Sequence, residues 1–142
     1  MAQKSLEDQL CNAAANGNLS EVLLCLERGA AINGLNSYSR NALQVAMLGH
    51  SKLVGELLRA GADPSVRDPV CGLTVLHDAA REGFEDTVRV LLDHGADLNV
   101  TDDRGYLPLH LADMKGHKGV VELLIGRTAF SKNTNGEGRP AI

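Results

Sequence analysis

Residues 73–97 read LTVLHDAAREGFEDTVRVLLDHGAD, and this stretch decides the fold. Apolar residues recur at helical spacing in both halves of the stretch, and a glycine ends each half, at Gly83 and at Gly95. The pattern predicts two short helices joined by a tight turn. A helix pair of about 25 residues buries too little apolar surface to offset its chain entropy, so it needs neighbours to pack against.

Those neighbours are copies of the same unit. Equivalent alanines, Ala13, Ala46, Ala79 and Ala112, follow one another at intervals of 33 residues. The helices that contain the last two alanines open with TVLH at residues 74–77 and LPLH at residues 107–110. A period of 33 with openings of the type T-P-L-H-x-A is typical of ankyrin repeats. We therefore predict an all-α fold with β-hairpin-like finger loops, an ankyrin-repeat solenoid of four helix-turn-helix repeats.

The repeat period divides the chain into one domain and a tail. We expect the ankyrin-repeat domain to span residues 1–127, with repeats at about 5–32, 37–65, 70–98 and 103–127. Residues 128–142 show no period and contain several Gly and Asn residues, which predicts a disordered tail. Because only 3% of the residues are aromatic and Trp is absent, the core is expected to consist of Leu, Val and Ala.

Composition and charge argue against several classes of function. The net charge of -4 and the lack of a Lys/Arg run disfavour binding to nucleic acid. The chain has no stretch of 18 apolar residues and no apolar segment after its first residues, so neither membrane insertion nor secretion is expected. Its three cysteines include no C-x-x-C pair, and we expect Cys11 and Cys25 to be buried and reduced. We predict a monomer located in the cytoplasm and nucleus.

The histidines do not indicate an enzyme. His77 and Asp78 are adjacent, but neighbouring residues on a helix point about 100° apart and cannot form a base with its orienting carboxylate. His77 and His110 each close an opening tetrad, where an imidazole bonds backbone and hydroxyl groups between repeats, so we assign them a structural role, as we do Gly83 and Gly95. The chain shows no metal-ligand cluster, nucleophile elbow or phosphate-binding loop. We therefore expect no catalysis, no metal and no cofactor.

The second repeat departs from the pattern of the others. Ala46 and Gly49 are three residues apart, whereas the corresponding residues of the other repeats are four apart. One residue is missing from the first helix, which predicts a helix of barely two turns or a single turn. In the finger before this helix, Ser39 stands where ankyrin repeats usually have glycine. We expect Ser39 to adopt a positive φ, or the turn to differ.

Asp78 is the second departure, because the equivalent residues of the flanking repeats are the aliphatic Val45 and Leu111. An ionised carboxylate at such a position is costly unless a cation pairs with it. The residues alone leave two sources open: Arg81, three residues further along the same helix, or a cation on a partner protein. Glu82 and Phe84 would complete a mixed polar and aromatic patch of the kind that anchors interfaces.

Three segments carry a more specific resemblance: VLHDAAREGFEDT at residues 75–87, NSYSRNALQVAMLGH at residues 36–50, and GADPSVRDP at residues 61–69. Over residues 7–126 the chain resembles the four-repeat members of the ankyrin-repeat inhibitors of cyclin-dependent kinases 4 and 6. The resemblance implies a protein that binds the isolated kinase beside its catalytic cleft and twists its two lobes apart. Such an inhibitor prevents activation by cyclin D and arrests the cell cycle in G1.

The resemblance also implies which residues contact the kinase. Asp78 matches an acidic residue that pairs with a kinase arginine, and Asp68 matches an acidic residue of the finger. The other implied contacts, from the second and third repeats, are Tyr38, Met47, Arg81, Glu82 and Phe84. The chain departs from the family pattern at Asn16 and Ser20, where an arginine and an acidic contact residue are common. The alternative function is that of a general ankyrin scaffold that binds a transcription or signalling protein.

Overall fold

The computed structural model describes the backbone of residues 5–132 and the side chains of residues 5–127. These residues form helices and loops, and no strand is assigned among them. The helices are α1 (Leu6–Ala15), α2 (Leu19–Glu27), α3 (Ala42–Val45), α4 (Ser51–Arg59), α5 (Val75–Glu82), α6 (Glu85–Asp93), α7 (Pro108–Met114) and α8 (Lys118–Lys132). They form four antiparallel pairs, which confirms the predicted all-α ankyrin-repeat solenoid.

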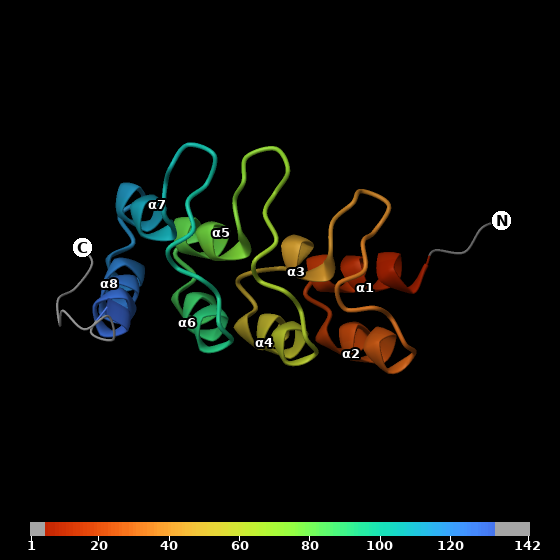
Figure 1. Ribbon diagram of the computed structural model, residues 1–142. Helices are drawn as coiled ribbons and strands as arrows, with labels where there is room; N and C mark the ends of the chain where they lie inside the picture. The colour runs from red at the N-terminus through yellow and green to blue at the C-terminus, as the bar shows by residue number, and fades with distance from the viewer. Residues whose placement is uncertain (1–4, 133–142) are drawn as a thin grey trace.

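The helices stand in two rows (Figure 1). The inner row contains α1, α3, α5 and α7, and the outer row contains α2, α4, α6 and α8. Neighbouring repeats pack through both rows, with α1 against α3 and α5 against α7 in the inner row, and α4 against α6 and α6 against α8 in the outer row. Three loops project in the same direction from the inner row: the first finger (31–40), the second finger (63–73) and the third finger (97–106).

The core runs through the length of the stack and is aliphatic. Its largest fully buried apolar side chains come from all four repeats: Leu10, Val22, Leu43, Leu53, Val54, Leu57, Leu76, Val88, Leu91, Val120 and Leu124. Cys11 and Cys25 are buried free thiols, as expected. Burial, assisted by the nearby carboxylates of Asp8 and Glu7, raises the pKa of Cys11 to about 11. That thiol therefore stays protonated and unreactive at neutral pH.

Local capping explains where most helices begin. Ser5, Asn18 and Asn41 accept hydrogen bonds from backbone N–H groups in the first turns of α1, α2 and α3. Such caps replace the partners that the first N–H groups of a helix lack. At the other end of α5, Gly83 takes a φ of 77°, a left-handed conformation that glycine adopts without steric cost.

The fingers are tight turns held by backbone pairs and by side-chain oxygens. In the second finger Asp68 donates its N–H to the Leu73 carbonyl, and in the third finger Asp102 pairs in the same way with Tyr106, both at 2.8 Å. The first finger repeats this hairpin-like closure, and Ser39 there has a φ of 60°. Of the two outcomes expected at this position, a positive φ at Ser39 or a different turn, the structure shows the positive φ. Serine takes the left-handed conformation that Gly105 takes in the third finger, with a φ of 85°.

The end of the domain corrects one expectation. Helix α8 continues to Lys132, past the expected domain end at residue 127, so residues 128–132 are helical rather than part of a disordered tail. The physical reason is that residues 127–132, RTAFSK, contain neither glycine nor proline, and the Asn- and Gly-rich sequence begins only at Asn133. The rest of the predicted tail, residues 133–142, lies outside the described residues. Within residues 5–132 no helix is long and apolar enough to cross a membrane.

The buried imidazole of His77 joins the third repeat to the fourth. Its Nδ1 accepts the N–H of Thr74 at 3.1 Å, so Nε2 carries the proton and donates to the Tyr106 carbonyl at 2.9 Å. Burial lowers the pKa of His77, against the opposing effect of the Tyr106 carbonyl. His110, the equivalent residue in the last described repeat, accepts the N–H of Leu107 at 2.9 Å and is exposed.

This burial predicts that acid destabilises the protein. The unfolded chain binds a proton at His77 as the pH falls below about 6.5, whereas the folded chain resists it, so the free energy of unfolding decreases as the pH falls through that value. Urea unfolding at about pH 7.5 and about pH 5.5 measures the loss. His77→Gln should be less stable at both values but show a smaller difference between them. An equal difference in both proteins would contradict this role for His77.

A second prediction concerns helix α5. Arg81 is its next-to-last residue, so Arg81→Pro removes a helical N–H and places the proline ring against the preceding turn, at a cost of about 3 kcal/mol or more. Thermal unfolding followed by circular dichroism should show a clearly lower melting temperature. Arg81→Ala is the matched control and should change the melting temperature far less. A wild-type melting curve for Arg81→Pro would show that the third repeat does not depend on this helix.

Candidate functional site

The polar cluster on α5 is formed by Asp78, Arg81 and Glu82. Arg81 forms an ion pair with Asp78 at 2.8 Å and a longer one with Glu82 at 3.6 Å. The Asp78 and Arg81 side chains are only 31% and 36% exposed, whereas Glu82 is 54% exposed. The local Asp78–Arg81 pair left open by the sequence therefore exists, in a half-buried position on the surface.

Arg81 does not fully offset the cost of burying the ionised carboxylate of Asp78. Burial raises the pKa of Asp78 above its usual range, and this effect exceeds the lowering by Arg81 and by His77. The neighbouring carboxylates of Asp68 and Glu82 raise the same pKa further. The ionised form of Asp78 is thus less favourable in the folded chain than in water, and an additional cation placed beside it would be stabilised.

Asp68 brings a second carboxylate to this area from the base of the second finger. One of its oxygens accepts the N–H of Val70 at 2.8 Å and shapes the turn. Its other oxygen lies 3.5 Å from the guanidinium of Arg40 in the first finger, and both side chains are about one third exposed. Sequence reasoning missed Arg40, because its partner is in another repeat and no local spacing relates them.

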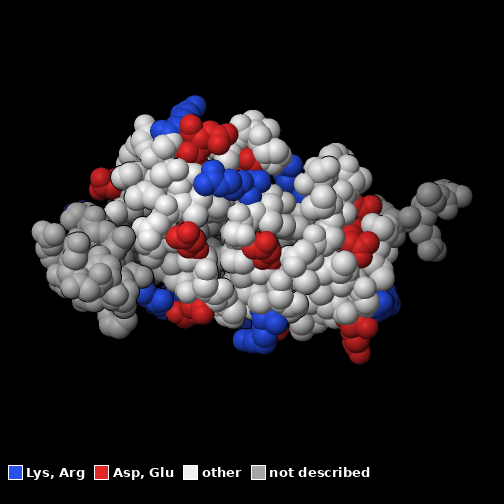
Figure 2. Space-filling view, in the orientation of Figure 1, with Lys and Arg blue, Asp and Glu red and all other residues white. Residues whose placement is uncertain are grey.

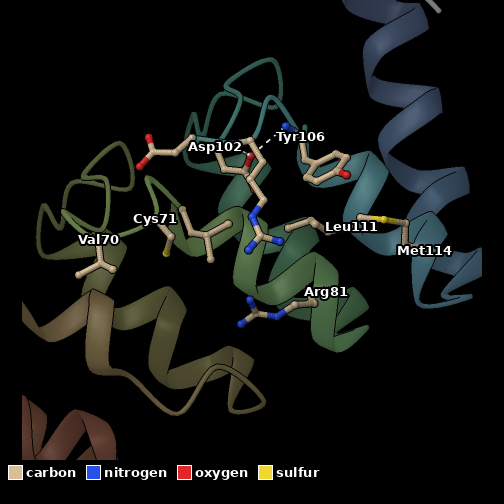
Figure 3. A pocket seen from close by; sticks show the side chains of 10 residues that line it. Val70, Cys71, Arg81, Asp102, Tyr106, Leu111 and Met114 are labelled. Carbon is tan, nitrogen blue, oxygen red and sulfur yellow. Dashed lines mark hydrogen bonds between the residues drawn. The ribbon is translucent and has the colours of Figure 1, made fainter.

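A groove opens between the second and third fingers beside this cluster (Figure 3). It has a volume of about 590 Å³. Its lining comes from the second finger (Val70, Cys71, Leu73), the third finger (Asp102, Asp103, Arg104, Tyr106), α5 (Arg81) and α7 (Leu111, Met114). Asp102 is largely occupied within its own finger, where it accepts the N–H groups of Arg104 and Tyr106, each at 2.9 Å. Arg81 therefore belongs to the polar cluster on α5 and also lines this groove, whose walls carry both apolar and charged side chains.

The shortened helix of the second repeat is confirmed, since α3 has only four residues. In the other three repeats the residue after the inter-helix glycine donates its N–H to the repeat alanine, as Phe84 does to Ala79 at 3.0 Å. In the second repeat His50 donates instead to Met47, and Met47 donates to Ala14 of the first repeat at 2.9 Å. Loss of one residue has thus turned the end of a helix into a short non-helical segment, residues 46–50.

Phe84 places its ring against Gly49, the glycine that comes one residue early in the second repeat. The edge of its ring lies 3.5 Å from where a side chain on Gly49 would begin. Phe84 is also the N-cap residue of α6 and makes no side-chain capping bond, whereas His50 at the same place before α4 accepts the N–H of Leu53 at 3.2 Å. Phe84 thus lacks a side-chain cap, which is usually worth about 1 kcal/mol, and places its ring against Gly49 instead.

The other two residues expected to contact a kinase, Met47 and Tyr38, lie apart from the polar cluster on α5. The sulfur of Met47 covers Gly17 of the first repeat, and the Met47 side chain is 46% exposed. Tyr38 is in the turn of the first finger and is 81% exposed. The structure thus brings Asp68, Asp78, Arg81 and Glu82 together, and leaves Tyr38 and Met47 as exposed groups at the first and second repeats.

The charge pattern on the visible face is mixed (Figure 2). Basic side chains gather near the second finger with acidic side chains above and below them, and no continuous basic stripe runs along this face. No group of His, Cys, Asp or Glu among the described residues could hold a metal ion. The site offers half-buried charges and exposed apolar side chains, which suit recognition of another protein.

The fold and this surface define an ankyrin-repeat binding protein, and residues 44–135 match the family described as ankyrin repeats in three copies. The chain is 43% identical to human cyclin-dependent kinase inhibitor 2A, over 90% of this chain and 82% of the relative. It is 45% identical to human cyclin-dependent kinase 4 inhibitor B, over 87% of this chain and 88% of the relative. The mouse cyclin-dependent kinase 4 inhibitor B is 43% identical over 84% of this chain and 92% of the relative. The protein belongs to the family of ankyrin-repeat cyclin-dependent kinase inhibitors.

Proposed function

We propose that this protein is a non-enzymatic inhibitor that binds the kinase subunit of cyclin-dependent kinases 4 and 6. The observation that carries the proposal is the state of Asp78. Its half-buried carboxylate is only partly compensated by Arg81 and lies near a second carboxylate, Asp68. A kinase arginine placed against these two groups would supply the charge that they lack, and the names of the related inhibitors identify the class of partner.

The contact surface in this proposal extends from the fingers to the inner helices. Asp68, Asp78, Arg81 and Glu82 form its polar centre, and Phe84, Met47 and Tyr38 supply apolar contacts on one side. The solenoid is a stack of packed repeats, so a surface of this kind binds with a small loss of conformational entropy. Half-buried charges surrounded by apolar groups are typical of the residues that dominate binding energy.

Inhibition in this proposal is allosteric. The protein binds beside the catalytic cleft, prefers a kinase conformation whose lobes are twisted apart, and thereby disfavours cyclin D binding, which holds the cell cycle in G1. Linkage requires that cyclin D in turn weakens inhibitor binding by the same factor. The inhibitor would act as a monomer, without a cofactor, wherever the free kinase occurs in the cytoplasm and nucleus.

The central test is binding of the purified protein to isolated kinases 4 and 6, with Asp78→Asn alongside. The substitution removes a carboxylate whose ionised form burial disfavours, so the melting temperature should stay equal or rise. The same substitution should weaken kinase binding by about 2–5 kcal/mol, because it leaves a kinase cation without its partner. Calorimetric titration and thermal unfolding measure the two effects.

Glu56→Gln is the matched control, because Glu56 also forms an i,i+3 ion pair with an arginine, Arg59, but on the outer helix α4. It should leave kinase binding unchanged. Asp78→Asn binding within a factor of two of wild type would refute the anchor role of Asp78. If well-folded wild-type protein bound neither kinase, the function of a general scaffold for a transcription or signalling protein would remain.

Phe84→His provides an independent prediction. Histidine keeps an aromatic ring over Gly49 and can cap α6 as His50 caps α4, so stability should change little. Kinase affinity should fall by about 1 kcal/mol or more, because a polar ring replaces an apolar contact. Urea unfolding and kinase titration on the same preparation separate the two quantities. Unchanged affinity would remove Phe84 from the contact surface.

A further inference from the structure

Thr87 is a buried polar residue at a position that the neighbouring repeats fill with aliphatic groups. It lies in the first turn of α6 and is 1% exposed. The equivalent residues, three after His50 and three after His117, are Leu53 in α4 and Val120 in α8, both fully buried. A buried hydroxyl needs a hydrogen-bond partner, and the third repeat would lose nothing in packing by having valine there. The partner of Thr87 should therefore explain its presence.

That partner is the carbonyl of Leu48, to which the Thr87 hydroxyl donates across 39 residues of sequence. Leu48 belongs to the non-helical segment 46–50 that replaces the end of α3. Because α3 ends at Val45, this segment lies outside the regular hydrogen bonding of a helix. The hydroxyl of the third repeat thus compensates for the residue lost from the second.

The N-cap residue and the first turn of α6 contact two successive residues of the segment. The Phe84 ring lies over Gly49 while the Thr87 hydroxyl holds the carbonyl of Leu48. From the other side, the N–H of Met47 is bound by the Ala14 carbonyl of the first repeat. The segment is therefore clamped between its two neighbours, and the Thr87 bond is the polar half of the clamp on the third-repeat side.

We propose that Thr87 is a positioning residue for kinase recognition: its hydrogen bond to Leu48 fixes residues 46–50 against α6, so that Met47 and Phe84 keep their relative places on the contact surface. The inference rests on the proposed function. Without the hydroxyl, the Met47–Ala14 bond still holds the segment on the first-repeat side, but on the third-repeat side the contact of Phe84 with Gly49 is apolar and non-directional, so it fixes the position of the segment along α6 less well. Thr87 itself is buried in the free protein and acts through Met47 and Phe84.

The test uses Thr87→Val, which keeps the shape of the side chain and removes the donor, and Thr87→Ser, which keeps the donor. The matched control is Val120→Ala, which removes buried apolar volume at the equivalent place in the fourth repeat, away from residues 46–50. The wild-type protein and these three variants, all as full chains, are compared for melting temperature, affinity for isolated kinases 4 and 6, and amide hydrogen exchange at residues 47–50. The exchange measurement needs no kinase.

We expect Thr87→Val to weaken kinase affinity about tenfold and to speed exchange at residues 47–50, with both effects reversed in Thr87→Ser. Val120→Ala should lower the melting temperature but leave affinity and local exchange as in wild type. A Thr87→Val protein that is less stable but binds the kinase with wild-type affinity would overturn the positioning role while the proposed function stands. Wild-type protein that binds neither kinase would overturn both, even if the exchange data showed the clamp.

Discussion

Contact between adjacent repeats is the constraint on which this structure depends, because no single helix pair buries enough apolar surface to fold alone. The aliphatic core continues from Leu10 to Leu124 through every repeat. Polar groups cross the same interfaces at fixed places, as His77 does with the Tyr106 carbonyl. The proposed contact surface depends on the same packing between repeats. Its residues come from fingers and helices of different repeats, so their relative positions are only as well defined as the packing between those repeats.

Much of the fold could be predicted because each ankyrin repeat is formed by one continuous stretch of sequence, so that its pattern recurs along the chain. The period of 33 placed the helix pairs, and the missing residue before Gly49 predicted a short α3. Because Ser39 stands where ankyrin repeats usually have glycine, either a positive φ or a different turn was expected there, and the structure has the positive φ. The predicted start of the tail was wrong because the Gly and Asn content of residues 133–142 was extended to residues 128–132, which contain neither residue and belong to α8. Helix ends are decided by individual breaking residues rather than by average composition.

The candidate site was less predictable, because its interactions join distant parts of the chain. The polarity of Asp78 was visible in the sequence, since both flanking repeats have aliphatic residues there, and its local partner Arg81 followed from helical spacing. The pairing of Asp68 with Arg40 and that of Thr87 with Leu48 connect different repeats, and no periodic pattern contains them. Thr87 nevertheless carried a signal of the same kind as Asp78: a polar residue in a column of aliphatic ones.

Thr87 and Asp78, the two polar residues at positions that are aliphatic in the neighbouring repeats, differ in the energetic cost of their burial. Thr87 finds its partner inside the molecule, so its burial costs little and orders a neighbouring segment. Asp78 finds only a partial partner, so its burial leaves an electrostatic cost in the free protein, seen in its raised pKa. A cost of this kind persists where another molecule removes it on binding, because the same groups that destabilise the free state then favour the complex. In the proposed complex, Thr87, whose hydroxyl is satisfied within the molecule, would hold the contact surface, and Asp78, whose charge is only partly satisfied, would bind the kinase.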